Sequence, residues 1–128
     1  MIREEKKMLK ITSTEIRITD LRLRAIIGIF DWERKTKQDV IVNISTTVDL
    51  FSVFQSDNFE ETVDYKSLTK EVIDLVESSK FYLIEKLAYE ILSIVLKRER
   101  VLQATVSLDK PCALRFADSV SITVSAQR

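Results

Sequence analysis

Apolar and polar residues alternate along four stretches of the chain, which is the pattern of β-strands that bury one face. The four stretches cover residues 15–27, 39–50, 102–108 and 119–125. The alternation slips by one position after Ile18, which predicts a bulge or irregular turn near Thr19 and Asp20. In the third stretch the predicted core positions are Leu102, Ala104, Val106 and Leu108.

Between the two pairs of strands, the apolar residues take up the spacing of amphipathic helices. The first helix is predicted to follow Asp64, a suitable N-cap, and its apolar positions are Leu68, Val72, Leu75 and Val76. The apolar stripe of the second helix consists of Ile84, Leu87, Ala88, Ile91, Leu92, Val95 and Leu96. The element order ββααββ predicts an α+β fold, in which a four-stranded antiparallel sheet carries two helices on one face.

The opposite face of the predicted sheet is polar, but it is built from small uncharged side chains. Its residues are Asn43, Ser45, Thr47, Gln103, Thr105, Ser107, Ser121 and Thr123. Long edge strands invite pairing with another chain. A ring of subunits joined edge to edge would hide those edges and enclose the polar face, so we expect a homo-oligomer.

Composition is that of an ordinary globular protein and argues against several classes of function. The chain has 128 residues, of which 45% are hydrophobic and 31% charged, and its formal net charge is zero. That length suits a single domain, which we assign to residues 15–128 after a polar tail over 1–14. A zero net charge gives no global attraction to nucleic acid. No apolar run approaches the ~20 residues of a membrane span, so we expect no membrane partner and a cytoplasmic location.

The chain contains one cysteine and no histidine. A zinc site of the usual ligands cannot be assembled from these residues, so we expect no metal. The usual proton carrier at neutral pH is missing as well. Lys110 stands out as a replacement, because it ends the third strand directly before the only proline, Pro111, where rigid backbone would hold its ammonium. Most lysines are solvated surface cations, so this position alone does not assign a role.

Four short segments together resemble a known family. They are Gly28 followed by Glu33, Thr62-Val63-Asp64-Tyr65, Leu83-Ile84-Glu85-Lys86-Leu87-Ala88, and Lys110-Pro111. In this order and spacing they resemble the dihydroneopterin aldolase family, which includes dihydroneopterin triphosphate 2′-epimerases. The resemblance covers almost everything after residue 15 and implies the tunnelling fold (T-fold) of pterin- and purine-handling enzymes.

Two stretches resemble the epimerase branch more than the aldolases. They are residues 22–29, and residues 113–120 together with the closing 125–128. Aldolases usually have Tyr-His-Gly where this chain has Ile26-Ile27-Gly28, and they carry a proline-rich loop ending in Gly-His that is absent after Lys110. The resemblance therefore implies 2′-epimerisation of 7,8-dihydroneopterin triphosphate to dihydromonapterin triphosphate. The alternative is aldolase cleavage to 6-hydroxymethyl-7,8-dihydropterin and glycolaldehyde, as in folate biosynthesis.

The resemblance also implies a role for each matching residue in binding the pterin ring. The Glu85 carboxylate would accept two parallel hydrogen bonds from the ring, and the backbone N–H of Ile84 or Glu85 would bind its carbonyl. Val63 would contribute to substrate binding as well. Without the resemblance, Glu85 reads as a solvated glutamate that complements the helix dipole.

The catalytic roles implied by the resemblance fall on three residues. Lys110 would handle protons at the ring nitrogen N5 and at C1′, through a bound water. Tyr65 would exchange a proton with the 2′-hydroxyl from an adjacent subunit, and Glu33 would hydrogen-bond the substrate side chain or the water. Among the cations that could neutralise the triphosphate are Arg34, Lys35, Lys37 and Arg115. No cofactor is implied, and the implied assembly is an octamer of two stacked tetrameric rings with sites at subunit interfaces.

Two alternatives from other classes remain. A zinc-dependent pyruvoyl-tetrahydropterin synthase of the same fold is disfavoured by the absence of histidine. A noncatalytic sheet that reads nucleic acid would need exposed aromatic residues on its open face and a basic surface. The sequence predicts neither feature.

Overall fold

The computed structural model describes residues 9–128. Its elements are β1 (Glu15–Ala25), β2 (Gln38–Val48), α1 (Val53–Ser56), the 3₁₀ helix η1 (Phe59–Glu61), α2 (Tyr65–Ser78), α3 (Ile84–Leu96), β3 (Val101–Pro111) and β4 (Ser119–Gln127). The predicted polar tail lies outside the described residues over 1–8, and residues 9–14 form no helix or strand. No helix within 9–128 is both long and apolar enough to cross a membrane.

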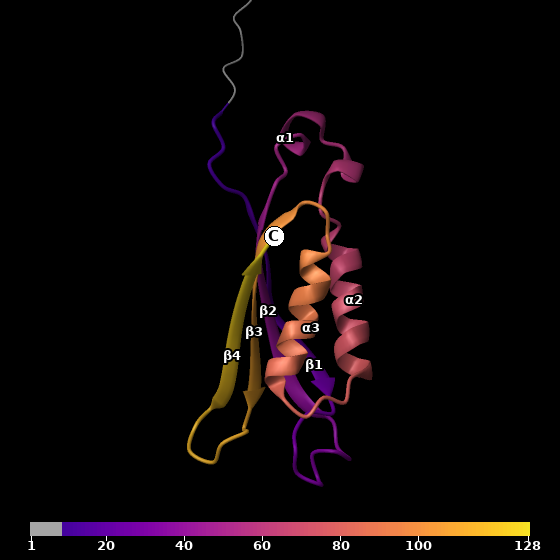
Figure 1. Cartoon of the computed structure of the whole chain (residues 1–128), viewed down its shortest axis with the longest axis vertical. Coiled ribbons are helices and arrows are strands. Elements are labelled where there is room, and N and C mark those ends of the chain that lie inside the picture. The colour runs from indigo at the N-terminus through magenta and orange to yellow at the C-terminus, as the bar shows by residue number, and fades with distance from the viewer. Residues whose placement is uncertain (1–8) are drawn as a thin grey trace, which may run out of the picture.

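The four strands form one antiparallel sheet in the order β1-β2-β3-β4, and α2 and α3 lie side by side on one of its faces (Figure 1). Helix α3 contacts β3 and β4, whereas α2 contacts β1 and α3. The predicted α+β fold with order ββααββ is therefore confirmed. Asp64 caps α2 as predicted, since its carboxylate accepts a hydrogen bond from the Ser67 N–H at 3.0 Å.

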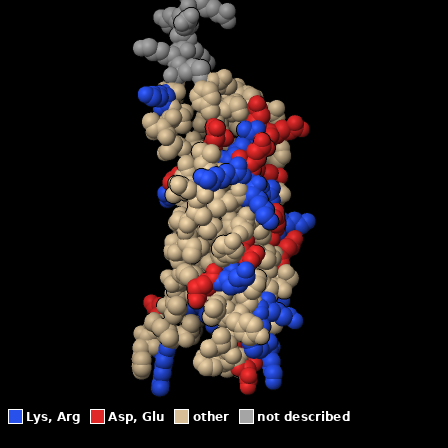
Figure 2. Space-filling view, in the orientation of Figure 1, with Lys and Arg blue, Asp and Glu red and all other residues tan. Residues whose placement is uncertain are grey.

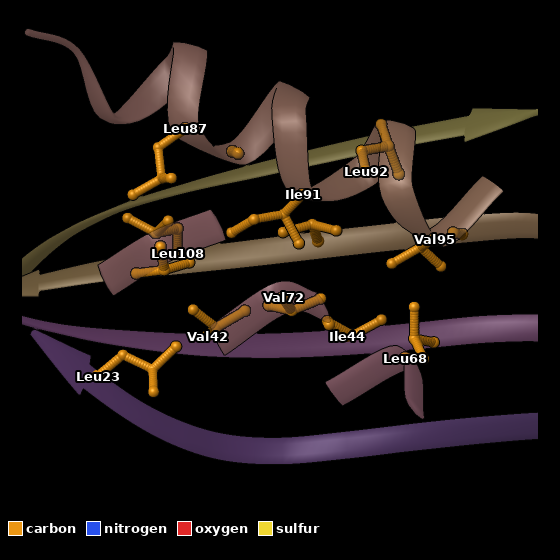
Figure 3. Packing of buried hydrophobic residues seen from close by; sticks show 14 of the residues in the cluster. Leu23, Val42, Ile44, Leu68, Val72, Leu87, Ile91, Leu92, Val95 and Leu108 are labelled. Carbon is orange, nitrogen blue, oxygen red and sulfur yellow. The ribbon is translucent and has the colours of Figure 1, made fainter. Parts of the chain in front are cut away.

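The core lies between the sheet and the two helices. Figure 3 shows Val42, Ile44 and Leu108 of the sheet pointing toward Leu87 and Ile91 of α3, and all five side chains are fully or almost fully buried. Burying side chains of this size contributes about 1.5–3 kcal/mol each relative to leaving them exposed. The alternating residues of β2 and the stripe along α3 therefore fix which face of each element points inward.

The predicted bulge in β1 is present at Asp20. The register between β1 and β2 shifts between Ile18 and Leu21, and Asp20 adopts a left-handed backbone with φ of 54°. Its N–H donates to the Asn43 side-chain oxygen at 2.8 Å. Asn43 thereby satisfies a backbone group that the interrupted ladder leaves unpaired.

The prediction that Leu102 belongs to the core is wrong. Leu102 is 47% exposed, and Val101 is fully buried instead. The cause is a shift in the register between β2 and β3, in which Thr47 pairs with Gln103 but Val48 pairs with Val101. The extra residue in β3 moves Leu102 off the core face, although Ala104, Val106 and Leu108 keep the predicted orientation.

The fold separates its connecting segments into two groups at opposite ends of the molecule. Figure 1 shows the end of β3 and the β1–β2 loop at one end, together with the start of α3. The short elements α1 and η1 and the start of α2 lie at the other end. Residues in these two groups cannot meet within one chain.

Candidate active site

An ion pair between Glu33 and Lys110 lies at the end of the fold where β3 ends and α3 begins. The Lys110 ammonium donates to the Glu33 carboxylate. The two side chains are only 13% and 6% exposed, for Lys110 and Glu33 respectively. The loop after β1 supplies the glutamate, and the end of strand β3 directly before Pro111 supplies the lysine, so residues 77 positions apart in the chain meet here.

The Glu33 carboxylate has two further donors. Its Oε2 accepts from the Gln38 side-chain amide at 3.1 Å, and its Oε1 accepts from the Phe30 N–H at 3.3 Å. Burial by itself would raise the pKa of Glu33, but the bonds from Lys110, Gln38 and Phe30 and the charge of Lys110 outweigh burial and lower this pKa. The carboxylate is therefore held ionised against the ammonium.

Gly28 is required by the position of the Glu33 side chain. Its φ of 132° is one that side-chain-bearing residues rarely adopt. A Cβ added at Gly28 would overlap with the Glu33 carboxylate carbon and both of its oxygens. The spacing of Gly28 and Glu33 in the sequence thus has a physical reason, since only glycine leaves room for the carboxylate to lie over the backbone.

A pocket of about 240 Å³ opens beside the Glu33–Lys110 pair. Its walls come from three segments: the loop with Gly28 and Glu33, the start of α3 with Ile84 and Glu85, and the end of β3 with Lys110. The structure therefore brings four of the predicted site residues together, namely Glu33, Ile84, Glu85 and Lys110.

The start of α3 presents hydrogen-bonding groups to this pocket. Glu85 lies in the first turn and is exposed, and Leu83 at the N-cap offers no side-chain bond to the first N–H groups of the helix. Backbone N–H groups at a helix start seek an outside acceptor. Glu85 and these N–H groups together offer both an acceptor and donors to a planar polar ligand.

Tyr65 and Val63 do not reach this pocket. They line a second pocket of about 590 Å³ between α1, η1 and the start of α2, and no residue lines both pockets. Tyr65 is 56% exposed, whereas Val63 is buried. The predicted site residues thus fall at the two ends of the fold, and Tyr65 and Lys110 of one chain do not line the same pocket.

Arg115 lies in the exposed loop between β3 and β4 and does not line the Lys110 pocket. Its guanidinium is 5.5 Å from the centroid of the Phe116 ring. Ala113 of that loop and Val120 at the start of β4 do line the pocket. The loop therefore borders the site, with the Arg115 cation near its tip.

Two residues beside the pocket make contacts that the sequence did not predict. Gln38, the first residue of β2, bridges the Ile27 carbonyl at 2.8 Å and the Glu33 carboxylate. Arg34, predicted as a cation for phosphate, donates instead to the carbonyls of Gly28, Phe81 and Lys80. Neither contact leaves a periodic signal in the sequence, because each depends on the path of the loop. Within residues 9–128, no group of three His, Cys, Asp or Glu side chains gathers as a metal site would need.

Known proteins of similar sequence show which family this chain belongs to. Residues 16–125 match the family described as FolB, dihydroneopterin aldolase. A dihydroneopterin triphosphate 2′-epimerase of Pseudomonas aeruginosa is 42% identical over 113 residues, which cover 88% of this chain and 92% of the relative. A dihydroneopterin aldolase of Haemophilus influenzae is 30% identical over 84% of this chain and 91% of its own length.

A solved structure agrees with these relationships. The dihydroneopterin aldolase of Escherichia coli in complex with neopterin superposes with a TM-score of 0.83 at 26% identity, over 88% of this chain and 98% of the other. The shared fold, the family match and the identities lead to one conclusion. The chain belongs to the dihydroneopterin aldolase family.

Proposed function

We propose that this protein is a dihydroneopterin triphosphate 2′-epimerase, which converts 7,8-dihydroneopterin triphosphate to dihydromonapterin triphosphate. The observation that carries the proposal is the buried Glu33–Lys110 pair in one pocket with Glu85. Such a pocket offers a proton donor and a planar-ring anchor a short distance apart. The 42% identity to an epimerase, against 30% to an aldolase, favours the epimerase outcome.

The pterin ring would bind at the start of α3. The Glu85 carboxylate accepts two parallel hydrogen bonds from the ring's 2-amino group and N3–H, which fixes the orientation of the ring in its own plane. The N–H of Ile84 or Glu85 binds the ring carbonyl. The exposed apolar side chains of Ile29 and Leu83 line the same pocket and cover the faces of the ring.

The reaction would break and re-form the C1′–C2′ bond. A base takes the proton of the 2′-hydroxyl, the C1′–C2′ electron pair moves into the ring's C=N bond, and Lys110 delivers a proton to N5. The products are a conjugated enamine and the phosphorylated aldehyde. In the return step the aldehyde presents its opposite face, C1′ attacks it, and both protons go back. The Glu33 carboxylate keeps the ammonium directed at the ring and hydrogen-bonds the substrate side chain or the ordered water.

The second candidate, dihydroneopterin aldolase, differs in the fate of one intermediate. An aldolase protonates the enamine at C1′ and releases both products, whereas an epimerase holds the aldehyde until the bond re-forms. The family match and the 30% identical aldolase support this candidate. We expect a low aldolase activity beside the epimerase activity, because the two reactions share this intermediate.

The same proposal includes an assembly in which two chains complete each site. Tyr65 and Val63 lie at the opposite end from Lys110, so the proton exchange at the 2′-hydroxyl needs a second chain. Strand β4 is an edge strand without a charged residue, and Figure 2 shows its side of the molecule largely free of the charges that gather over α2. Edge strands without charges are suited to pairing. We propose an octamer of two stacked tetrameric rings, joined through these edges.

Arg115 belongs to the proposal as a cation for the triphosphate. Its loop borders the pocket, and its guanidinium is held only by the Phe116 ring in residues 9–128. A guanidinium on an exposed loop can turn toward a phosphate that leaves the pocket. The exposed, free Cys112 at the start of this loop suits a reducing compartment such as the cytoplasm.

The decisive experiment is incubation of the purified protein with dihydroneopterin triphosphate and, separately, with dihydroneopterin. Chromatography that resolves the two 2′-epimers and 6-hydroxymethyl-dihydropterin follows each reaction. We expect the triphosphate to give its epimer faster than any cleavage product, and Lys110→Ala to abolish both. Rapid cleavage of dihydroneopterin with no epimer from the triphosphate would assign the protein to the aldolases.

A further inference from the structure

A side chain outside the pocket joins two of its walls. The Arg34 guanidinium donates to the carbonyls of Gly28 at 3.0 Å, Phe81 at 3.1 Å and Lys80 at 2.6 Å. It also lies 4.0 Å from the centroid of the Tyr82 ring. The planar guanidinium is the side chain best suited to serve several acceptors and an aromatic face at once.

The two walls that Arg34 joins carry the two halves of the proposed chemistry. The loop from Gly28 carries Glu33, which holds Lys110, and the segment from Lys80 leads directly into Glu85. Within residues 9–128, three hydrogen bonds join these two segments, and Arg34 donates two of them. The third, from the Gly28 N–H to the Phe81 carbonyl, is longer, at 3.3 Å.

We propose that Arg34 is a positioning residue, which sets the separation between the pterin anchor at Glu85 and the proton-handling Glu33–Lys110 pair. It also holds the Tyr82 ring, which lines the pocket, in place as part of the wall. The inference rests on the proposed function. Three carbonyls and a ring occupy the guanidinium, so Arg34 acts on the walls and does not bind the substrate phosphates.

The test compares Arg34→Lys and Arg34→Ala with the wild type, using dihydroneopterin triphosphate. Both variants remove the three-carbonyl contact, although the first keeps the charge. We expect each to lower kcat about tenfold or more, because small displacements of reacting groups are costly, while KM changes less than about threefold. Free guanidinium chloride, far below denaturing concentrations, should restore part of the kcat of Arg34→Ala and none of that of Arg34→Lys, whose side chain fills the gap.

Lys80→Ala is the matched control, because it removes a neighbouring exposed cation but leaves the Lys80 carbonyl that Arg34 binds. This variant should keep wild-type kcat and KM. The inference is overturned if Arg34→Lys retains wild-type kinetics, or if KM for the triphosphate alone rises, which would indicate phosphate binding. It is also overturned if melting temperature falls while kcat per folded site is unchanged. A wild-type protein that leaves both pterins unaltered would instead refute the proposed function.

Discussion

Glu33 is the residue whose environment most constrains the proposed chemistry. Its carboxylate is buried, yet it receives donors from Lys110, Gln38 and Phe30, and these donors hold its pKa below its ordinary value of 4.5. An ionised carboxylate at this position keeps the ammonium pointed into the pocket. The same donors also couple the site to the stability of the folded chain.

Replacing Glu33 with glutamine tests this coupling. The amide keeps the shape but loses the charge, so we expect the free energy of unfolding at pH 7 to fall by about 2 kcal/mol, the usual contribution of a charged hydrogen bond. Because the folded pKa is lowered, the unfolded chain binds the proton more readily, and wild-type stability falls as pH drops below 4.5. The free energy of unfolding of the wild type and of Glu33→Gln is measured by urea unfolding at one protein concentration, from pH 3 to 7.

The two unfolding curves should differ by a constant amount above pH 4.5 and converge as pH falls through the lowered pKa of Glu33. A difference that persists unchanged at pH 3 would show that the carboxylate contributes by its shape and not by its charge. Gln38→Glu is not a suitable control, because it would place a second carboxylate against Oε2. Lys80→Ala, which changes an exposed cation nearby, is the appropriate one.

Single residues were predictable where their role depends on local sequence, and not where it depends on a distant partner. Lys110 could be identified because a strand and Pro111 fix its backbone. The Gly28–Glu33 spacing was recognisable through the family pattern, although its physical reason, the carboxylate lying over a residue without Cβ, needs the loop's path. The contacts of Arg34 could not be predicted, because two of its three acceptors are carbonyls 46 and 47 residues away.

At the scale of elements, the C-terminal end of α3 is held by hydrogen bonds from the side chain of Arg128, which follows β4. The Arg128 guanidinium donates to the carbonyls of Leu96 at 2.8 Å, Arg98 at 2.6 Å and Glu99 at 2.7 Å. The final carbonyls of a helix have no partner within it and carry the negative end of its dipole. Arg128 therefore closes α3 and ties it to the edge strand.

Arg128→Ala should lower the melting temperature without changing the chemistry. The side chain is exposed, so we expect a loss of about 1 kcal/mol, which corresponds to roughly 3–6 °C for a chain of this size. Arg128→Lys keeps the charge but not the three-carbonyl contact, so its melting temperature should fall by less than that of Arg128→Ala. Calorimetry at a fixed concentration is the measurement, and an unchanged melting temperature for Arg128→Ala would refute the capping role.

Helices and strands could be predicted where their apolar spacing repeats over many residues, and not where the element is short. The strands and the helices α2 and α3 repeat their apolar spacing often enough to be recognised, and burial then enforces it. The four residues of α1 and three of η1 are too short to show a period. The register shift beside Val48 could not be foreseen, because pairing with β3 decides it, and it exchanged Leu102 for Val101 in the core.

At the scale of the whole molecule, the residues of the proposed site lie in two separate pockets. Lys110 and Glu85 line one pocket and Tyr65 lines another, at the opposite end of the fold. Exposed aromatic residues occur at both ends, including Phe30 and Tyr82 at the first and Phe59 and Tyr65 at the second. Exposed apolar side chains around two half-sites are typical of surfaces that meet in an assembly.

A divided site can be tested by complementation between two inactive variants. Lys110→Ala lacks the proposed proton donor and Tyr65→Phe lacks the phenol, and we expect each alone to lose most of the proposed epimerase activity. If each site takes Lys110 from one chain and Tyr65 from its neighbour, random mixing at equal amounts leaves roughly a quarter of the sites intact in a symmetric ring. Joint unfolding and refolding of the two variants should therefore restore roughly a quarter of wild-type activity.

The control is the double variant, with Lys110→Ala and Tyr65→Phe on one chain, mixed with either single variant. No site in that mixture has both groups, so its activity should stay at the level of the single variants. Native mass spectrometry of the refolded mixture shows whether subunits have exchanged, because the two variants differ in mass. Exchanged mixtures that remain inactive would mean that Lys110 of one chain and Tyr65 of its neighbour do not complete one site. Recovered activity would place the reaction at the contact between chains, because Lys110 and Tyr65 of a single chain lie too far apart to act on one substrate.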